Sequence, residues 1–247
     1  MRFLQPFSAA LQFLTIIPVG GHIPQTALGR AMPWFPVAGL VIGVGAGLAY
    51  TLALLLGLPP MAASLVGVLA LSGLSGFLHL DGVADTADGF FSARSRDKIL
   101  DIMRDSHVGT MGVVGLFAVL GLKWAALTSM PPDMAWKALV LAPVLGRTAQ
   151  VCSMILLPYA RSSGGLASIF INSRRRSDMY WALGIAGTAA LFAGGTGVAA
   201  LILAALTVFL FSLWCMKKIG GITGDTVGAA TEIVETAALC AVCALVA

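Results

Sequence analysis

The sequence predicts an all-α fold: a polytopic membrane bundle of about six to seven transmembrane helices. Three observations support this prediction. Of the 247 residues, 58% are hydrophobic and 11% are charged, whereas an ordinary soluble domain carries about 25% charged residues. Apolar stretches of about 20 residues recur along the chain, long enough to cross a bilayer core of about 30 Å. Basic residues gather in alternate connectors. We expect one membrane domain over residues 1–247.

The apolar stretches define the expected spans in chain order. Those long enough to cross a membrane are 34–57, 60–80, 108–129, 134–157, 197–216 and 228–247. A shorter stretch at 180–195 is the seventh candidate. The N-terminal segment MRFLQPFSAALQFLTIIPV is interrupted by polar residues and prolines and lacks a signal-peptide cleavage site. We therefore interpret it as interfacial or re-entrant.

The basic residues indicate which side of the membrane is cytoplasmic. Every second connector, together with the N-terminal part, is basic and holds Arg2, Arg30, Arg94, Arg96, Lys98, Arg104, Arg161, Arg174, Arg175, Arg176, Lys217 and Lys218. The positive-inside rule assigns this side to the cytoplasm. Lys123, Lys137 and Arg147 fall within spans; we expect the two lysines to snorkel near the outer ends and Arg147 to lie deeper. The net charge of +4 thus reflects topology, and nothing in the sequence suggests a nucleic-acid partner.

The most distinctive stretch, LHLDGVADTADGFFSAR at 78–94, is acidic and follows an apolar run. Asp81, Asp85 and Asp88 are spaced i, i+4 and i+7, which places them on one helical face within an arc of about 60°. No basic residue lies between them to neutralise their charge. Clustered carboxylate oxygens near a membrane favour Mg²⁺, or alternatively Mn²⁺, over zinc. Because Mg²⁺ is commonly bound by a few carboxylates and substrate phosphates, the site is expected to act on a diphosphate.

A second acidic row follows a turn that Gly89 allows. With Ser95 as N-cap, Asp97, Asp101 and Asp105 recur every four residues and are expected to face the first row. Simpler explanations exist for this row. Asp97 complements the dipole of the first helical turn, and Asp101 has Lys98 and Arg104 at the spacing of a surface ion pair.

Two further segments fit the same side of the membrane. GGITGDTVGAATEIVE at 220–235 begins with glycines whose N–H groups could meet phosphate, and Asp225, Glu232 and Glu235 share one helical face. YARSSGGL at 159–166 could close over a nucleotide with Arg161. A flexible loop carrying one topology-determining arginine explains the second segment nearly as well.

Taken together, FLHLDGVADTADGFFSARSRDKILDIMRDSHVGTMGV, MPWFPVAGLVIG and GGITGDTVGAATEIVE resemble the cobalamin-5′-phosphate synthase family, also called adenosylcobinamide-GDP ribazoletransferase. The resemblance runs in motif order from about Pro33 to Glu235. It implies an Mg²⁺-dependent transferase of the bacterial inner membrane. Such an enzyme joins adenosylcobinamide-GDP to α-ribazole or its 5′-phosphate and releases GMP, which completes the nucleotide loop of cobalamin.

The acidic block also resembles the CDP-alcohol phosphotransferase motif, D-x-x-D-G-x-x-A-R followed by G-x-x-x-D-x-x-x-D. Asp85, Asp88, Gly89, Ala93 and Arg94 match the first half with one extra residue before Ala93, and Ala93 stands where the second half has its glycine. Because of these departures, the role of each aspartate in that motif cannot be assigned to an individual aspartate of this sequence.

A hypothesis of mechanism assigns a role to each candidate site residue. The metal ligands are expected among Asp81, Asp85, Asp88 and Asp101; Arg94 supports the leaving GMP; Asp105 is the general base; and Asp225, Glu232 and Arg161 contact the substrate. An intramembrane prenyltransferase with DxxxD pairs and a divalent-cation transporter remain alternatives. The second is disfavoured because transporters place ligands near the membrane midplane, whereas these acids follow the ends of spans. The sequence leaves the oligomeric state open, a homo-oligomer included.

Overall fold

The computed structural model describes residues 5–20, 24–161 and 166–246. Within these ranges the chain forms helices and one isolated parallel bridge between Tyr159 and Ile222. In chain order the elements are α1 (Gln5–Leu14), α2 (Gln25–Leu28), the 3₁₀ turn η1 (Met32–Trp34), α3 (Phe35–Leu55), α4 (Pro60–Leu74), α5 (Leu78–Phe90), α6 (Arg96–Ile102), α7 (Thr110–Thr128), α8 (Pro132–Leu156), α9 (Leu166–Ser173), α10 (Arg176–Phe192), α11 (Gly195–Ile219) and α12 (Gly224–Val246).

The structure confirms an all-α bundle built for a membrane. Five segments are long and apolar enough to cross a bilayer, namely Met32–Leu55 with α7, α8, α11 and α12, and the bent pair α4–α5 would be a sixth. The shorter predicted stretch at 180–195 corresponds to α10, which has 17 residues and begins earlier, at Arg176.

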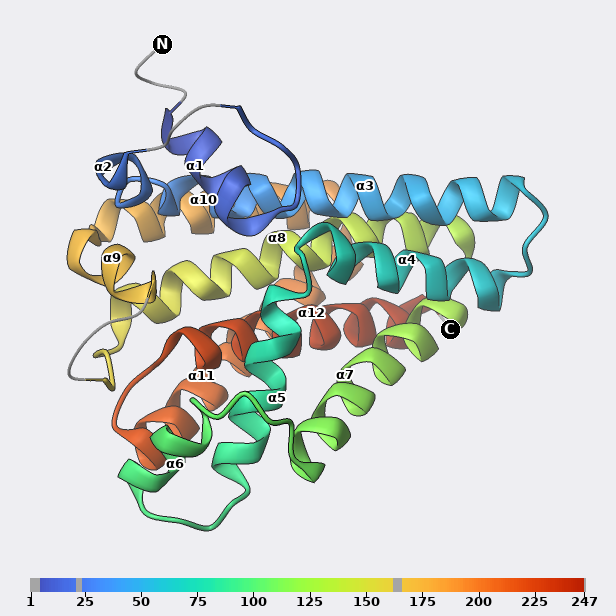
Figure 1. The fold of residues 1–247 in the computed structure, drawn as a ribbon. Coiled ribbons are helices and arrows are strands. Elements are labelled where there is room, and N and C mark those ends of the chain that lie inside the picture. Colours follow the sequence, from blue (N-terminus) through green and yellow to red (C-terminus); the bar gives the residue numbers. More distant parts are fainter. Residues whose placement is uncertain (1–4, 21–23, 162–165, 247) are drawn as a thin grey trace.

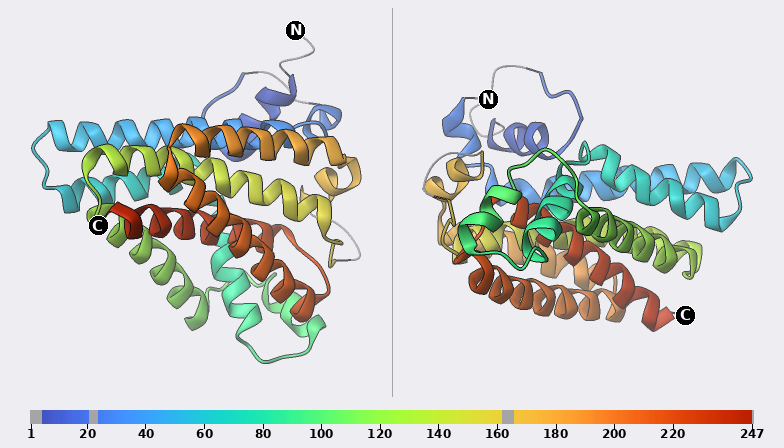
Figure 2. Two further views of the ribbon diagram at one scale, coloured as in Figure 1. Left: turned by 180° about the vertical axis from the view of Figure 1, so that it is seen from behind. Right: turned by 60° about the horizontal axis from the view of Figure 1, so that its bottom comes forward.

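The long helices run roughly side by side, so that connectors collect at the two ends of the bundle (Figures 1 and 2). One end holds α1, α2 and α9 with the starts of α3 and α12, and the basic connectors also lie there (Figure 1). The short connectors after α3 and α7 lie at the other end, and the connector after α10 lies toward that end but does not reach it (Figure 2). This alternation is the one expected from the sequence; that the basic end faces the cytoplasm stays a prediction.

The prediction of one continuous span over 60–80 is wrong. The helix stops at Leu74, and α5 leaves at 89° to α4 (Figure 1). The break occurs where Gly76 and Phe77 adopt left-handed conformations, with φ of 61° and 58°. A run of α-helix cannot continue through left-handed residues. The bend places the aspartates of α5 against the end of the bundle.

Small residues allow the helices to approach closely. A Cβ at Gly39 or Gly43 of α3 would meet the backbone of α8 around Pro143 and Leu139. Between α5 and α12, a Cβ at Gly82 would meet the Asp225 carbonyl. Such close backbone contact is the usual basis of helix association in membranes. The α5–α12 contact brings the acidic helix next to the predicted glycine-rich loop.

Helix α1 lies outside the bundle, beside the start of α3 (Figure 1). Its 10 residues extend about 15 Å, half the thickness of a bilayer core. Ala9, Ala10 and Leu14 are buried, whereas Gln12 is exposed. An amphipathic helix of this length agrees with the interfacial interpretation of the N-terminal segment.

Candidate active site

The three aspartates of the first acidic row lie on α5, as the spacing predicts. Asp81 is exposed, and Asp85 and Asp88 are half-buried. The charges that act most strongly on Asp85 are the carboxylates of Asp81, Asp225 and Asp88 and the guanidinium of Arg161. The structure therefore brings the predicted residues of α5, α12 and the α8–α9 connector together.

Asp88 also has a structural task. Its two carboxylate oxygens accept hydrogen bonds from the backbone N–H groups of Gly109 and Gly112, at 2.7 and 2.8 Å. These amides begin α7, where four N–H groups lack partners within the helix. A Cβ at either glycine would collide with the Asp88 carboxylate. The two glycines of the sequence VGTMG thus leave room for the Asp88 carboxylate. The spacing of residues in the sequence could not show this role.

The second acidic row departs from the prediction. Helix α6 ends at Ile102, so Asp105 lies beyond the helix and not on its face. Asp97 and Asp101 are exposed, and neither is among the strongest charges acting on Asp85. Residues 103–104 form a turn and 106–107 a bend before α7 begins, so the helix does not continue to Asp105. Two facing rows of carboxylates are therefore not formed.

Asp105 is paired with a residue that the sequence did not single out. Its Oδ1 lies 2.6 Å from Nδ1 of His107 and accepts the His107 backbone N–H at 3.1 Å. Both hydrogen bonds hold the pKa of Asp105 below its ordinary value. The side chain is therefore an exposed, ionised carboxylate with an imidazole as its neighbour.

The turn between α5 and α6 does not occur at Gly89, because α5 continues through Phe90. Its left-handed residue is Ala93, with φ of 54°. This is the position at which the CDP-alcohol phosphotransferase motif carries glycine. Arg94 follows on the exposed side of the turn. Arg96 turns inward and donates to the carbonyl oxygens of Ile219 and Ala160, at 2.8 and 2.7 Å.

Arg161 and Asp225 face each other at the end of the bundle. The bridge between Tyr159 and Ile222 aligns the connector that carries Arg161 with the connector that leads into α12, whose first turn carries Asp225. Arg161 Nη2 donates to Asp225 Oδ2 at 2.8 Å, and the Thr223 hydroxyl donates to the same oxygen at 3.2 Å. The remainder of the predicted nucleotide loop, residues 162–165, lies outside the described residues.

A cavity of about 240 Å³ opens between these segments. Its polar lining comprises His79, Asp81, Gln150, Tyr159, Arg161 and Asp225. A larger cavity of about 470 Å³ lies among α8, α10 and α11, but its described lining residues are all uncharged. The smaller cavity is therefore the candidate for the chemistry.

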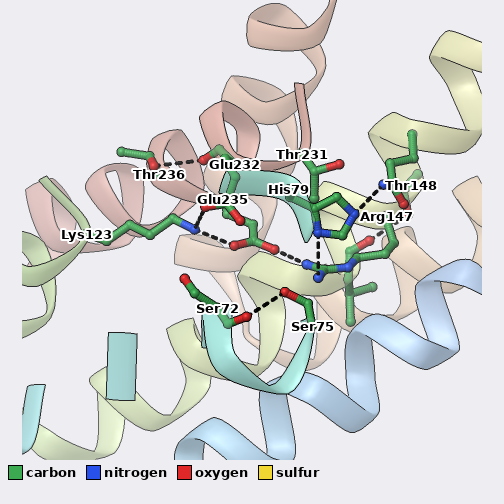
Figure 3. Close-up of polar contacts among 12 residues, drawn as sticks. Ser72, Ser75, His79, Lys123, Arg147, Thr148, Thr231, Glu232, Glu235 and Thr236 are labelled. Atoms are coloured by element: carbon green, nitrogen blue, oxygen red, sulfur yellow. Dashed lines mark hydrogen bonds and ion pairs between the residues drawn. The ribbon is translucent and has the colours of Figure 1, made fainter. Parts of the chain in front are cut away.

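Behind the cavity lies a network of buried charges (Figure 3). Lys123 donates to Glu232 at 2.6 Å and to Glu235 at 2.5 Å, and Glu235 is also paired with Arg147. All four side chains are at most 2% exposed. The expectation that Lys123 snorkels to the outer surface is wrong, because two carboxylates neutralise it inside the bundle. Since Glu232 is held by Lys123, it belongs to this network and not to the cavity lining.

The donors of the cavity suit a divalent cation that a substrate helps to bind. Within residues 5–20, 24–161 and 166–246, no three His, Cys, Asp or Glu side chains lie close enough together to enclose a metal ion. Mg²⁺ commonly takes one or two carboxylates and completes its shell with water and phosphate oxygens. Asp81 and Asp225 supply such carboxylates at the cavity. The chemistry of these donors therefore fits Mg²⁺.

The comparisons with known proteins agree with the resemblance in the sequence. The sequence model of the family described as cobalamin-5-phosphate synthase matches residues 6–243. The chain belongs to this family. Among its curated relatives, proteins named adenosylcobinamide-GDP ribazoletransferase from Herpetosiphon aurantiacus, Roseiflexus sp. and Geotalea daltonii are 39%, 42% and 38% identical. The alignments cover 98%, 95% and 94% of this chain and 98%, 87% and 94% of the relatives. No solved structure matches the chain.

Proposed function

We propose that the protein is an Mg²⁺-dependent adenosylcobinamide-GDP ribazoletransferase of the bacterial inner membrane. It transfers the adenosylcobinamide phosphate to α-ribazole, or to α-ribazole 5′-phosphate, and releases GMP. The observation that carries the proposal is the convergence of Asp81, Asp85, Asp225 and Arg161 on one end of the bundle. The family match over nearly the whole chain supports it. The basic end, by the positive-inside rule, faces the cytoplasm.

In the proposed reaction, a ribose hydroxyl of α-ribazole attacks the phosphorus that carries the cobinamide. A new P–O bond forms, the P–O bond between the two phosphates breaks, and GMP leaves. Asp81 and Asp225 would hold Mg²⁺ at the cavity, with Asp85, Asp88 and Asp101 as further predicted ligands, and the metal would supply positive charge that neutralises the phosphate oxygens. Arg94 supports the leaving GMP, and Arg161 contacts the phosphates.

Asp105 accepts the proton of the attacking hydroxyl in this proposal. Its carboxylate is ionised and exposed, as a base that meets a substrate must be. His107, hydrogen-bonded to Asp105, orients the carboxylate. A positioned general base contributes about 10²- to 10⁴-fold to a rate.

The decisive experiment uses the purified full-length protein with adenosylcobinamide-GDP, α-ribazole and Mg²⁺. GMP and a cobalamin product should form together, and a chelator should stop both. Asp81→Asn and Asp85→Asn should abolish turnover while the protein still inserts, and exposed Asp97→Asn should cost much less. Release of pyrophosphate without GMP would favour a prenyltransferase, and near-normal activity in both of the first variants would refute the assigned metal ligands.

The cytoplasmic location of this end is tested by labelling in intact and opened cells. Single cysteines introduced at Ser95, Ser173 and Thr223 should all react from the cytoplasm, and one at Pro131 from outside. Labelling of Ser95 and Ser173 positions from opposite sides would separate the segments that the mechanism needs on one face.

A further inference from the structure

The larger cavity, of about 470 Å³, has no task in the chemistry described so far. It is a groove between α10 and α11, and α8 forms its floor. The two outer helices diverge from the turn that joins them, so the groove widens toward the basic end of the bundle (Figure 2, left). Its described lining residues are uncharged, and almost all of them carry hydrocarbon side chains. An occupant of this groove therefore has to be apolar along its length.

The groove is open at the basic end and closed at its inner end. Leu156, Leu213 and Met216 line the open end and are exposed, whereas Leu145 and Ala204 line the inner end and are buried. Between Leu145 and Leu156, helix α8 rises about 17 Å. One leaflet of the hydrocarbon core of a bilayer is about 15 Å thick. An acyl chain of that leaflet, entering from the basic end, therefore matches the groove in length.

Three consecutive arginines, Arg174, Arg175 and Arg176, lie at the open end and are exposed. Arg174 Nη1 donates to the carbonyl oxygens of Met154 and Leu157 at the end of α8, both at 3.0 Å. Because Leu157 lines the groove, this guanidinium is held beside the opening. Its remaining N–H groups are available to an anion that arrives there.

The charge of the three arginines is only partly neutralised by the protein. In the part of the chain that the structure describes, none of them forms an ion pair. One acid, Asp178, lies near them, but it is buried and accepts the backbone N–H of Arg175 at 3.2 Å, where it caps α10. The next residue, Met179, already lines the groove. Three guanidinium groups against one carboxylate leave the opening positive.

We propose that the groove binds an anionic phospholipid. One acyl chain lies along α8 between α10 and α11, and the phosphate contacts the guanidinium groups of Arg174, Arg175 and Arg176. Basic residues at the end of a groove between membrane helices are a recognised setting for anionic headgroups. A second copy of the chain suits the groove less well. Inserted in the same orientation, it would bring its own basic connectors to the same end, where like charges repel.

The bound lipid would act on the catalytic end through α8. The face of α8 opposite the groove carries Arg147 and Gln150, whose side chains lie 3.4 and 2.6 Å from the two ring nitrogens of His79 on α5. Helix α5 also carries the aspartates of the candidate active site. A lipid that holds the end of α8 in place therefore supports the packing of α5. The site itself is separate from the smaller cavity and does not rest on the proposed function.

The first test uses the full-length protein, purified in detergent and stripped of lipid. Phosphatidylglycerol should remain bound as a single lipid in native mass spectrometry, and it should bind about tenfold more tightly than phosphatidylcholine with the same chains. Ala205→Trp fills the groove and should abolish this binding, whereas Ala118→Trp on the exposed side of α7 is the matched control and should not. Equal affinity for the two lipids, binding retained in Ala205→Trp, or a dimer in place of bound lipid would overturn the proposal.

The second test removes the charge at the opening. Arg175→Gln with Arg176→Gln should weaken phosphatidylglycerol about 30-fold, at about fivefold for each arginine, and should leave phosphatidylcholine unchanged. Arg174 is kept because it also binds the end of α8. Lys98→Gln with Arg104→Gln removes the same charge from exposed positions of the α5–α7 connector and should change little. An equal loss in both double variants would mean that the lipid responds to overall charge and not to this site.

A third measurement covers the case in which Ala205→Trp fails to fold. Leu213 and Leu210 of α11 are 53% and 54% exposed, but only Leu213 lines the groove. Phosphatidylglycerol should slow alkylation of the thiol of Leu213→Cys by N-ethylmaleimide and should leave the thiol of Leu210→Cys unaffected. The same rate with and without the lipid at Leu213→Cys would show that the groove does not hold it.

Discussion

Two groups of charged side chains on neighbouring helices differ in their burial and in their ion pairing. The acids of α5 and the α5–α7 connector are exposed or half-buried, and among them only Asp97 and Asp105 have ion-pair partners in the described structure. Lys123, Arg147, Glu232 and Glu235 are almost completely buried and paired with one another. Unneutralised carboxylates leave negative charge free to attract a cation. A neutral network has nothing left to bind and instead fixes the helices and His79.

This comparison predicts that changes in the first group affect turnover and changes in the second affect stability. After the metal-ligand variants, the largest effect is expected for Asp105→Asn, which keeps the size and the acceptor oxygen but removes the base. Turnover should fall by about 10²- to 10⁴-fold, up to about 5 kcal/mol in the barrier, with the loss in kcat and with KM little changed. Steady-state kinetics of GMP release is the measurement. Recovery of activity at high Mg²⁺ would instead identify Asp105 as a metal ligand.

Lys123→Met should lower the free energy of unfolding by about 3–5 kcal/mol, because Glu232 and Glu235 then share a buried site with one cation fewer. The double variant Lys123→Met with Glu232→Gln should recover much of this loss, since the site is neutral again. Lys137→Met, on the exposed side of α8, is the control and should change little. Thermal unfolding in detergent measures all three, and an unaffected Lys123→Met would mean that the network does not hold the bundle.

Asp88→Asn tests a residue of the first group that also has a structural role. Asparagine has only one acceptor oxygen, so one of the two amides at Gly109 and Gly112 loses its partner, which should cost about 1–3 kcal/mol of stability. Asp81→Asn should cost no stability, because it relieves repulsion at an exposed position. Chemical denaturation of both variants measures their stability and so distinguishes the loss of hydrogen bonds at the start of α7 from the loss of a metal ligand. Equal stability of the two would remove the structural role of Asp88.

The smallest expected effect concerns the turn between the two acidic segments. Ala93→Gly should raise stability by about 1 kcal/mol, because glycine adopts the left-handed conformation without steric cost. Ala93→Val should lower it, since a β-branched residue tolerates this conformation poorly. The shift in the unfolding midpoint of the two variants should have opposite signs, and turnover should change little in Ala93→Gly. The same sign for both would mean that the turn is not strained.

The sequence by itself determined the class of the protein, most of its spans and the acidic face of α5, because apolar length and helical spacing are local properties that survive in any packing. It also determined the family through motifs. Only the tertiary structure decided the rest. The break at Gly76 and Phe77 depends on backbone conformation that composition does not reveal, and α6 ends before Asp105. The partners of Lys123 and Asp88 are 109 and 21 residues away along the chain, so the spacing of residues in the sequence could not reveal them. The helix packed against an apolar helix decides whether a charged side chain on it snorkels, forms an ion pair or binds a ligand.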